Sequence, residues 1–173
     1  MKKDCSILFA LAALLFIGMG AAHAAVLASQ SPCAASGGFC GSIPANGTVF
    51  NIRQLNFNAP SAGQALVSVN GSGYCENFLF DAAVAEFDTQ IVSNPGAPPL
   101  FSGPGGNKFK FVLPARAPNT LTGNGVFNLS SQRLFSVKGA GIQHYAINAV
   151  ADRIDSSVTC YVTSAALTVL FLP

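Results

Sequence analysis

Charge is scarce in this sequence. Nine lysines and arginines and seven aspartates and glutamates make up 9 % of its 173 residues, against roughly 25 % in ordinary soluble domains. Nucleic-acid binders need basic patches that neutralise phosphates, and disordered chains combine high net charge with few apolar residues. This chain has a formal net charge of +2 and is 50 % hydrophobic, so neither class fits and no nucleic-acid partner is expected.

Histidine is rare as well, and tryptophan is absent. His144 is the only histidine after residue 24, whereas a Ser-His-Asp hydrolase needs a histidine base and a nucleophile motif such as G-x-S-x-G, which is missing. The zinc motif H-E-x-x-H is missing too, and the glycine-rich stretch 103–106 lacks the lysine and the helix of a phosphate loop. We expect His144 to be an ordinary exposed strand residue, and we expect no cofactor and no metal.

The N-terminus predicts a secretory signal. Two lysines precede an uninterrupted apolar stretch, residues 7–17, and residues 22–24 read Ala-His-Ala, the pattern of a cleavage site. We therefore predict that residues 1–24 are a cleaved signal peptide of bacterial type and that residues 25–173 form one domain, secreted or periplasmic, with no stable membrane insertion. An uncleaved anchor is the alternative, because residues 6–27 carry no charge and are long enough to span a bilayer.

Four cysteines follow residue 24, an even number that indicates two disulfides in an exported chain. Four cysteines permit three pairings. We favour Cys33–Cys40, which closes a loop of small residues, and Cys75–Cys160, which joins two segments of strand-like sequence. Zinc binding is the competing interpretation, but it needs paired spacings such as C-x2-C, which this sequence lacks.

Hydrophobic alternation of period two recurs between clusters of Gly, Pro, Asn and Ser, whereas helical periodicity is hard to find. The sequence therefore predicts an all-β fold, a two-sheet antiparallel sandwich of jelly-roll type with about eight strands. A change of parity predicts a β-bulge near Arg53 and Gln54, and residues 70–73 are expected to form a turn. The clearest predicted strands are residues 48–58, 64–70, 79–92, 107–113, 126–137, 142–150 and 158–172.

Three sequence features together resemble one known class of fold. They are the P-x-A-G pattern that opens PSAGQALVSVNGSGYC at residue 60, the V-x-G-A-G pattern before an aromatic-bearing strand in SVKGAGIQHY, and an apolar C-terminal strand. Over about two thirds of the chain after residue 24, the pattern resembles small secreted bacterial jelly-roll modules of the C1q/TNF-like type. This resemblance implies a non-catalytic binding or structural module, often trimeric.

One long connection is a candidate contact surface. Residues 94–106 contain four prolines and four glycines, a composition that can neither continue a helix nor pair in a sheet. Long loops on a rigid β scaffold are common binding sites. The candidate contact residues in this loop are Pro98, Pro99, Leu100 and Phe101.

Carboxylates and tyrosines are the candidates for chemistry and recognition. Glu86 and Asp88 share one strand face about 6.5–7 Å apart along the strand, and paired carboxylates serve glycoside hydrolysis or calcium binding. A solvated strand face is the alternative interpretation of this pair. Tyr74, Tyr145 and Tyr161 offer rings on which a sugar could stack, although the larger surface of tryptophan is lacking.

Three functions remain in view. The first is a non-catalytic module that acts by surface contact with a protein or a glycan, as a monomer or a homo-oligomer such as a trimer, since weakly charged surfaces often mark contacts. The second is a small glycan-acting hydrolase that uses Glu86 and Asp88. The third is a pilus-type subunit assembled by strand complementation, for which the nine residues from Ala25 to Cys33 leave little room for a donor strand.

Overall fold

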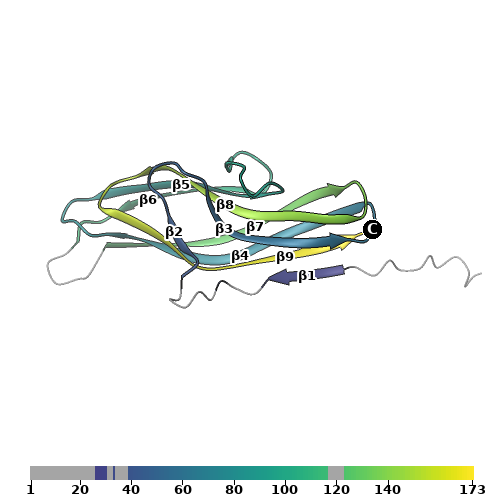
Figure 1. Cartoon of the computed structure of the whole chain (residues 1–173). Coiled ribbons are helices and arrows are strands. Elements are labelled where there is room, and N and C mark those ends of the chain that lie inside the picture. The colour runs from purple at the N-terminus through teal and green to yellow at the C-terminus, as the bar shows by residue number, and fades with distance from the viewer. Residues whose placement is uncertain (1–25, 31–32, 34–38, 117–122) are drawn as a thin grey trace, which may run out of the picture.

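The computed structural model describes residues 26–30, 33, 39–116 and 123–173 (Figure 1). The predicted signal peptide, residues 1–24, lies outside the described residues. The described part of the chain contains no helix with the length and hydrophobicity to cross a membrane. Its elements are the strands β1 (Val26–Gln30), β2 (Gly41–Ile43), β3 (Phe50–Ala59), β4 (Gly63–Asn77), β5 (Ala83–Val92), β6 (Gly106–Leu113), β7 (Gly123–Val137), β8 (Gly141–Ile154) and β9 (Val158–Leu172).

The strands form two antiparallel sheets packed face to face (Figure 1). Sheet A has the order β1-β9-β4-β7, with β2 also paired to β9, and sheet B has the order β3-β8-β5-β6. From β2 onward successive strands alternate between the sheets, except that β5 and β6 pair within sheet B. This is the order of a jelly roll, so the predicted all-β sandwich is confirmed. The described residues form nine strands where about eight were expected, because β1 and β2 pair with different parts of the same strand, β9.

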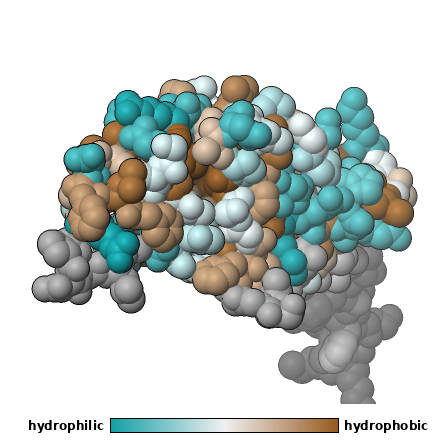
Figure 2. All heavy atoms as spheres, turned by 60° about the vertical axis from the view of Figure 1, so that its left-hand side comes forward, coloured by the Kyte–Doolittle hydropathy of each residue, from teal (hydrophilic) through white to brown (hydrophobic). Residues whose placement is uncertain are grey.

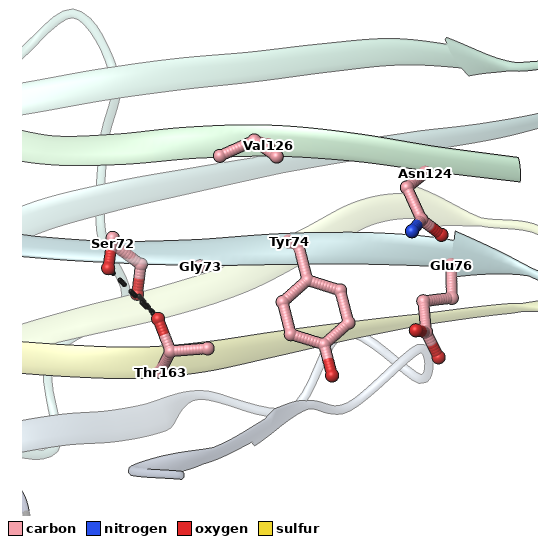
Figure 3. A pocket seen from close by; sticks show the side chains of 7 residues that line it. All are labelled: Ser72, Gly73, Tyr74, Glu76, Asn124, Val126 and Thr163. Atoms are coloured by element: carbon pink, nitrogen blue, oxygen red, sulfur yellow. Dashed lines mark hydrogen bonds between the residues drawn. The ribbon is translucent and has the colours of Figure 1, made fainter. Parts of the chain in front are cut away.

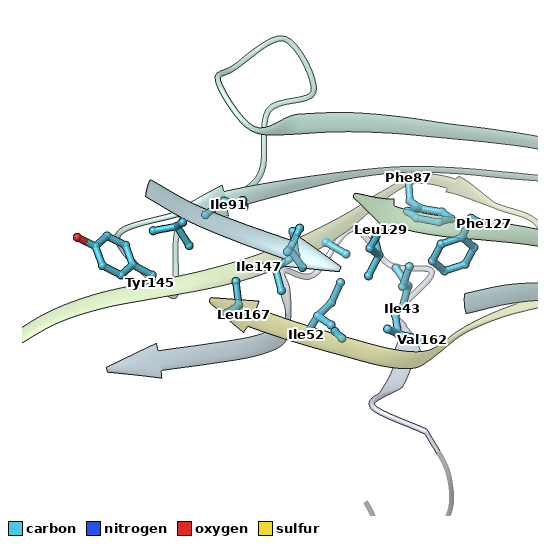
Figure 4. Packing of buried hydrophobic residues seen from close by; sticks show 14 of the residues in the cluster. Ile43, Ile52, Phe87, Ile91, Phe127, Leu129, Tyr145, Ile147, Val162 and Leu167 are labelled. Carbon is cyan, nitrogen blue, oxygen red and sulfur yellow. The ribbon is translucent and has the colours of Figure 1, made fainter. Parts of the chain in front are cut away.

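Alternating side chains fill the space between the sheets (Figure 4). The inward residues of β9, among them Leu167, Val169 and Phe171, are fully buried, as period-two alternation requires. Leu172 is exposed, so the apolar end of this strand faces the core on one side only. The labelled core residues in Figure 4 are Ile43, Ile52, Phe87, Ile91, Phe127, Leu129, Tyr145, Ile147, Val162 and Leu167.

The turn predicted at residues 70–73 is wrong, because β4 runs straight through this segment. A Cβ atom on Gly73 would overlap the Phe127 ring and the carbonyl oxygen of Tyr161. The glycine therefore serves close packing inside a strand rather than a change of direction. Sequence patterns do not separate these two uses, since both favour the residue without a side chain.

Two other local predictions have different outcomes. The register of β3 against β8 shifts between Asn51 and Arg53, and this bulge, one residue from its predicted place, lets both Ile52 and Leu55 face the core. The strand predicted from residue 79 begins only at Ala83. Residues before it form a turn because the buried Asn77 side chain donates to the carbonyl of Asp81 at 2.7 Å.

Both expected disulfides are present. Cys75 and Cys160 are directly opposite each other on β4 and β9 and are fully buried. The Cys33–Cys40 bond closes the segment between β1 and β2, and the Cys40 amide donates to the Val162 carbonyl on β9 at 2.7 Å. Each bond thus anchors a neighbour of β9 in sheet A.

Candidate functional site

The outer face of sheet A is almost free of charge. Its outward-facing residues on β4, β7 and β9 are mainly Ser, Thr, Asn, Gln and Leu, and Glu76 is the only charged one among them. The Arg133 side chain of β7 points elsewhere, since its Nη1 donates to the Ile91 carbonyl of sheet B at 2.7 Å. This face therefore offers neutral hydrogen-bonding groups in place of ion pairs.

Three aromatic rings meet at one end of this face. The centroids of Tyr74 and Tyr161 lie 5.3 Å apart, and the Phe39 ring lies 5.4 Å from Tyr161 and 6.2 Å from Tyr74. We call Phe39, Tyr74 and Tyr161 the aromatic platform. Pairs at these separations attract each other beyond simple burial, so the platform is an ordered surface.

The disulfides explain why these rings meet. Tyr74 pairs with Tyr161 in the same register that places Cys75 opposite Cys160. Since side chains alternate along a strand, the disulfide lies in the core and the tyrosine pair lies outside. Phe39 immediately precedes Cys40, whose bond to Cys33 and whose hydrogen bond to β9 hold that segment beside the tyrosines.

A shallow cavity of about 330 Å³ adjoins the aromatic platform (Figure 3). On its floor the Thr163 hydroxyl donates to the Ser72 carbonyl at 2.9 Å, and the Ser72 hydroxyl lies 2.9 Å from Thr163 Oγ1 and 3.0 Å from Ser164 Oγ. This network fixes the hydroxyl groups before any ligand arrives. The cavity is lined by Ser72, Gly73, Tyr74, Glu76, Asn124, Val126 and Thr163.

The tyrosine hydroxyls differ in their surroundings. Burial, with smaller contributions from the Glu76 carboxylate and from Tyr161, raises the pKa of Tyr74, so its hydroxyl stays neutral and can both donate and accept. Tyr145, the third candidate from the sequence, is 2 % exposed and packs on Phe135 at 4.9 Å. The structure therefore brings Tyr74 and Tyr161 together and removes Tyr145 from the surface.

The candidate contact loop folds back over sheet B. The buried Asn148 side chain donates to the carbonyls of Pro95 and Ala97, both at 2.8 Å. Gln90 donates to the Pro104 carbonyl at 3.2 Å and accepts from the Leu100 amide at 2.9 Å. These contacts hold the loop in one conformation over a second cavity of about 340 Å³.

The four loop candidates have unequal exposure. Pro98, Leu100 and Phe101 are exposed, and Pro99 is buried. The Phe101 ring lies over the Lys108 ammonium, 4.7 Å from it. The loop is thus part of the charged surface of sheet B, and its contact with a partner stays a prediction.

Glu86 and Asp88 lie on the outer face of sheet B beside lysines. The Lys108 ammonium lies 3.0 Å from Glu86 Oε1 and 3.8 Å from Asp88 Oδ1. Hydrogen bonds from Lys108 and Lys110 hold the pKa of Glu86 below its usual value, whereas burial raises the pKa of Asp88. A hydrolase needs room for a glycosidic bond between its two carboxylates, and here the lysine head group occupies that space.

His144 lies on the same outer face of sheet B and is exposed. Its Nδ1 lies 2.9 Å from the Asn56 side-chain oxygen on the neighbouring strand β3. Within the described ranges no group of three His, Cys, Asp or Glu residues could hold a metal ion.

Comparison with known proteins gives structural similarity only. No family model matches the chain, and no curated protein gives a significant match. A chain of infectious bursal disease virus, Gx strain, has a TM-score of 0.41 at 10 % identity over 86 % of this chain, which covers 32 % of that chain. A CBM35 from Cellvibrio japonicus Abf62 has a TM-score of 0.24 at 12 % identity, with 83 % and 92 % coverage.

A family two carbohydrate esterase from Cellvibrio japonicus has a TM-score of 0.21 at 12 % identity over 87 % of this chain and 36 % of that chain. This chain thus spans about a third of the length of the virus and esterase chains. The function proposed below rests on the residues of this chain and not on these similarities.

Sequence reasoning missed three parts of the site: Phe39, Glu76 and the hydroxyl groups of Ser72 and Thr163. One signal for the tyrosine pair was nevertheless in the sequence, because Tyr-Cys at 74–75 is mirrored by Cys-Tyr at 160–161. Antiparallel strands that bond these cysteines place the flanking tyrosines opposite each other. No local pattern marks Phe39 or Glu76, which join the site only through strand pairing.

Proposed function

We propose that this protein is a non-catalytic glycan-binding module, secreted or periplasmic, that binds its ligand on the outer face of sheet A. The observation that carries the proposal is the aromatic platform beside a cavity lined by hydroxyl and amide groups. Ligand sites combine apolar surface with a few fixed polar groups, and a sugar ring presents both a C–H face and hydroxyls. Two disulfides suit an oxidising compartment.

Binding to immobilised neutral oligosaccharides, followed by calorimetry, tests this proposal. Tyr161→Ala should weaken binding at least tenfold, because it removes a ring that a sugar would stack on, a loss of about 1.4 kcal/mol or more. Tyr161→Phe should retain most of the affinity, because it keeps the ring.

Phe101→Ala is the matched control. It removes an exposed ring from the loop on sheet B and should leave glycan binding unchanged. If Phe101→Ala abolishes binding and Tyr161→Ala does not, the loop is the contact surface and the aromatic platform is not. Circular dichroism of each variant separates a lost contact from a lost fold.

We also propose the assembly and processing that the sequence favours: cleavage after residue 24 and a homo-oligomer, a trimer if the C1q/TNF-like resemblance holds. β9 already has strand partners from its own chain on both sides, β4 on one and β1 with β2 on the other, which speaks against the pilus-type alternative. Native mass spectrometry of the exported protein gives its mature mass and its copy number. A monomer that retains residues 1–24 would contradict both proposals.

A further inference from the structure

Glu76 places a negative charge at the proposed glycan site. It follows Tyr74 by two residues on β4, so both side chains point outward, about 6.5–7 Å apart along the strand. Figure 3 shows the Glu76 carboxylate and the Tyr74 ring projecting to the same side of β4. Both residues line the cavity, so a sugar stacked on Tyr74 lies within reach of the carboxylate.

The contrast with the carboxylates of sheet B shows what Glu76 lacks. Glu86 and Asp88 face lysines, and Asp155 is bonded to Arg153 at 2.9 Å. Among the described residues, no lysine, arginine or histidine forms a salt bridge with Glu76. Its neighbours across β7 and β9 are the neutral Asn124 and Thr159.

On the outward face of β4, β7 and β9, as far as the structure describes it, no cation competes with a ligand for this carboxylate. A protonated amine on the sugar gains an ion pair there, and a sugar carboxylate meets repulsion. Exposed ion pairs are worth little each, so the expected discrimination per contact is a few-fold rather than a thousand-fold. A site whose described residues supply one carboxylate and no cation cannot attract acidic glycans by the same means.

We propose that Glu76 makes the platform selective for glycans that carry free amino groups, such as oligomers of glucosamine, and against glycans that carry uronic acids. This selectivity rests on the proposed glycan-binding function. Glu76 acts as a specificity residue, whereas the rings of Tyr74 and Tyr161 supply the contact that all the sugars share.

Calorimetry with three oligosaccharides of equal length tests the selectivity: glucosamine, N-acetylglucosamine and galacturonic acid oligomers. At low salt the wild type should bind the amine-bearing oligomer about fivefold more tightly than the neutral one, the upper range for an exposed ion pair. It should bind the acidic oligomer most weakly. In Glu76→Gln the three affinities should be equal, and the affinity for the neutral oligomer should be the same as in the wild type.

Asp81→Asn is the matched control, because it removes one exposed negative charge from outside the cavity. It should keep the wild-type ranking, and added salt should compress that ranking. If Glu76→Gln ranks the oligomers as the wild type does, the selectivity is wrong although the glycan site stands. If the wild type binds none of the three, both the selectivity and the proposed function fail.

Discussion

The two outer faces of the sandwich present opposite chemistry to water. Sheet A shows hydroxyls, amides and one carboxylate, with a shallow cavity beside three rings. Sheet B bears a compact charged cluster and a loop that hydrogen bonds hold against the sheet. The cluster consists of Glu86, Asp88, Lys108, Lys110, Asp152, Arg153 and Asp155.

The difference shows how a chain with so few charges distributes them. On sheet B the charged groups satisfy one another: Lys108 alone contacts Asp152 at 2.7 Å and Glu86 at 3.0 Å. Groups engaged in this way have less freedom to contact a partner. On sheet A the polar groups other than the Glu76 carboxylate are neutral, and aromatic side chains lie beside them. A surface that binds weakly charged ligands needs little else.

The largest expected effect comes from damage to sheet A alone. Gly73→Ala places a Cβ against the Phe127 ring and the Tyr161 carbonyl, and overpacking of this kind costs about 3 kcal/mol of unfolding free energy. Urea denaturation measures the loss. Gly139→Ala has nothing within 4 Å of its new Cβ and should change stability by less than about 0.5 kcal/mol. Equal effects at both sites would refute the packing role of Gly73.

A smaller effect is expected from releasing the loop on sheet B. Asn148→Ala removes the donor that serves the Pro95 and Ala97 carbonyls, so about 2 kcal/mol of stability should be lost. Amide hydrogen exchange in the loop should rise while glycan binding on sheet A persists. Asn58→Ala, at an exposed position on the same sheet, is the control. Unchanged hydrogen exchange in Asn148→Ala would mean that the conformation of the loop does not depend on the Asn148 hydrogen bonds.

The smallest expected effect is on the stability of the protein at acidic pH. The pKa values of Glu86 and Asp155 are lowered by their cationic partners, so their stabilisation is present above the ordinary values of 4.5 and 3.8 and is lost as pH falls through the lower folded values. The pKa of Asp88 is raised by burial, so its contribution has the opposite sign. It is present below 3.8 and is lost as pH rises through the folded value.

Asp88→Asn should therefore steepen the acid-induced loss of stability. The change is under about 1 kcal/mol, because the cluster is partly solvated. Thermal unfolding between neutral pH and pH 3, compared for the wild type and Asp88→Asn, measures it. If the stability of Asp88→Asn depends on pH as that of the wild type does, Asp88 does not offset the acid-induced destabilisation caused by Glu86 and Asp155. Glycan binding at neutral pH should be the same in both proteins, because Asp88 lies on the other sheet.

The fold was readable from sequence because its signals are repetitive. Alternation over many strands outweighs single errors, and an even number of cysteines in strand-like segments leads to the Cys75–Cys160 pair. The site was readable only in part. Tyr74 and Tyr161 were identified as sugar-stacking candidates, but nothing near Phe39 in the sequence links it to them, since their contact depends on how β2 pairs with β9.

For the loop of residues 94–106, the sequence predicts the connection but not the contacts that hold it in place. Its composition correctly predicts a connection between β5 and β6. Asn148, which anchors it, lies more than 40 residues further along the chain and resembles any polar strand residue. An exposed contact surface and an anchored cover have the same local sequence, and only the tertiary partner separates them.

The Cys75–Cys160 bond has a mechanical consequence. A load applied at the C-terminus would peel β9 away from β4, beginning at Leu172 and passing Leu167. Such peeling breaks the β4–β9 pairing one residue pair after another. It would stop at the covalent bond of Cys160, one residue beyond Tyr161. A module pulled by its C-terminus would therefore keep β4 and β9 joined beside its tyrosine pair under loads that strip the rest of the strand.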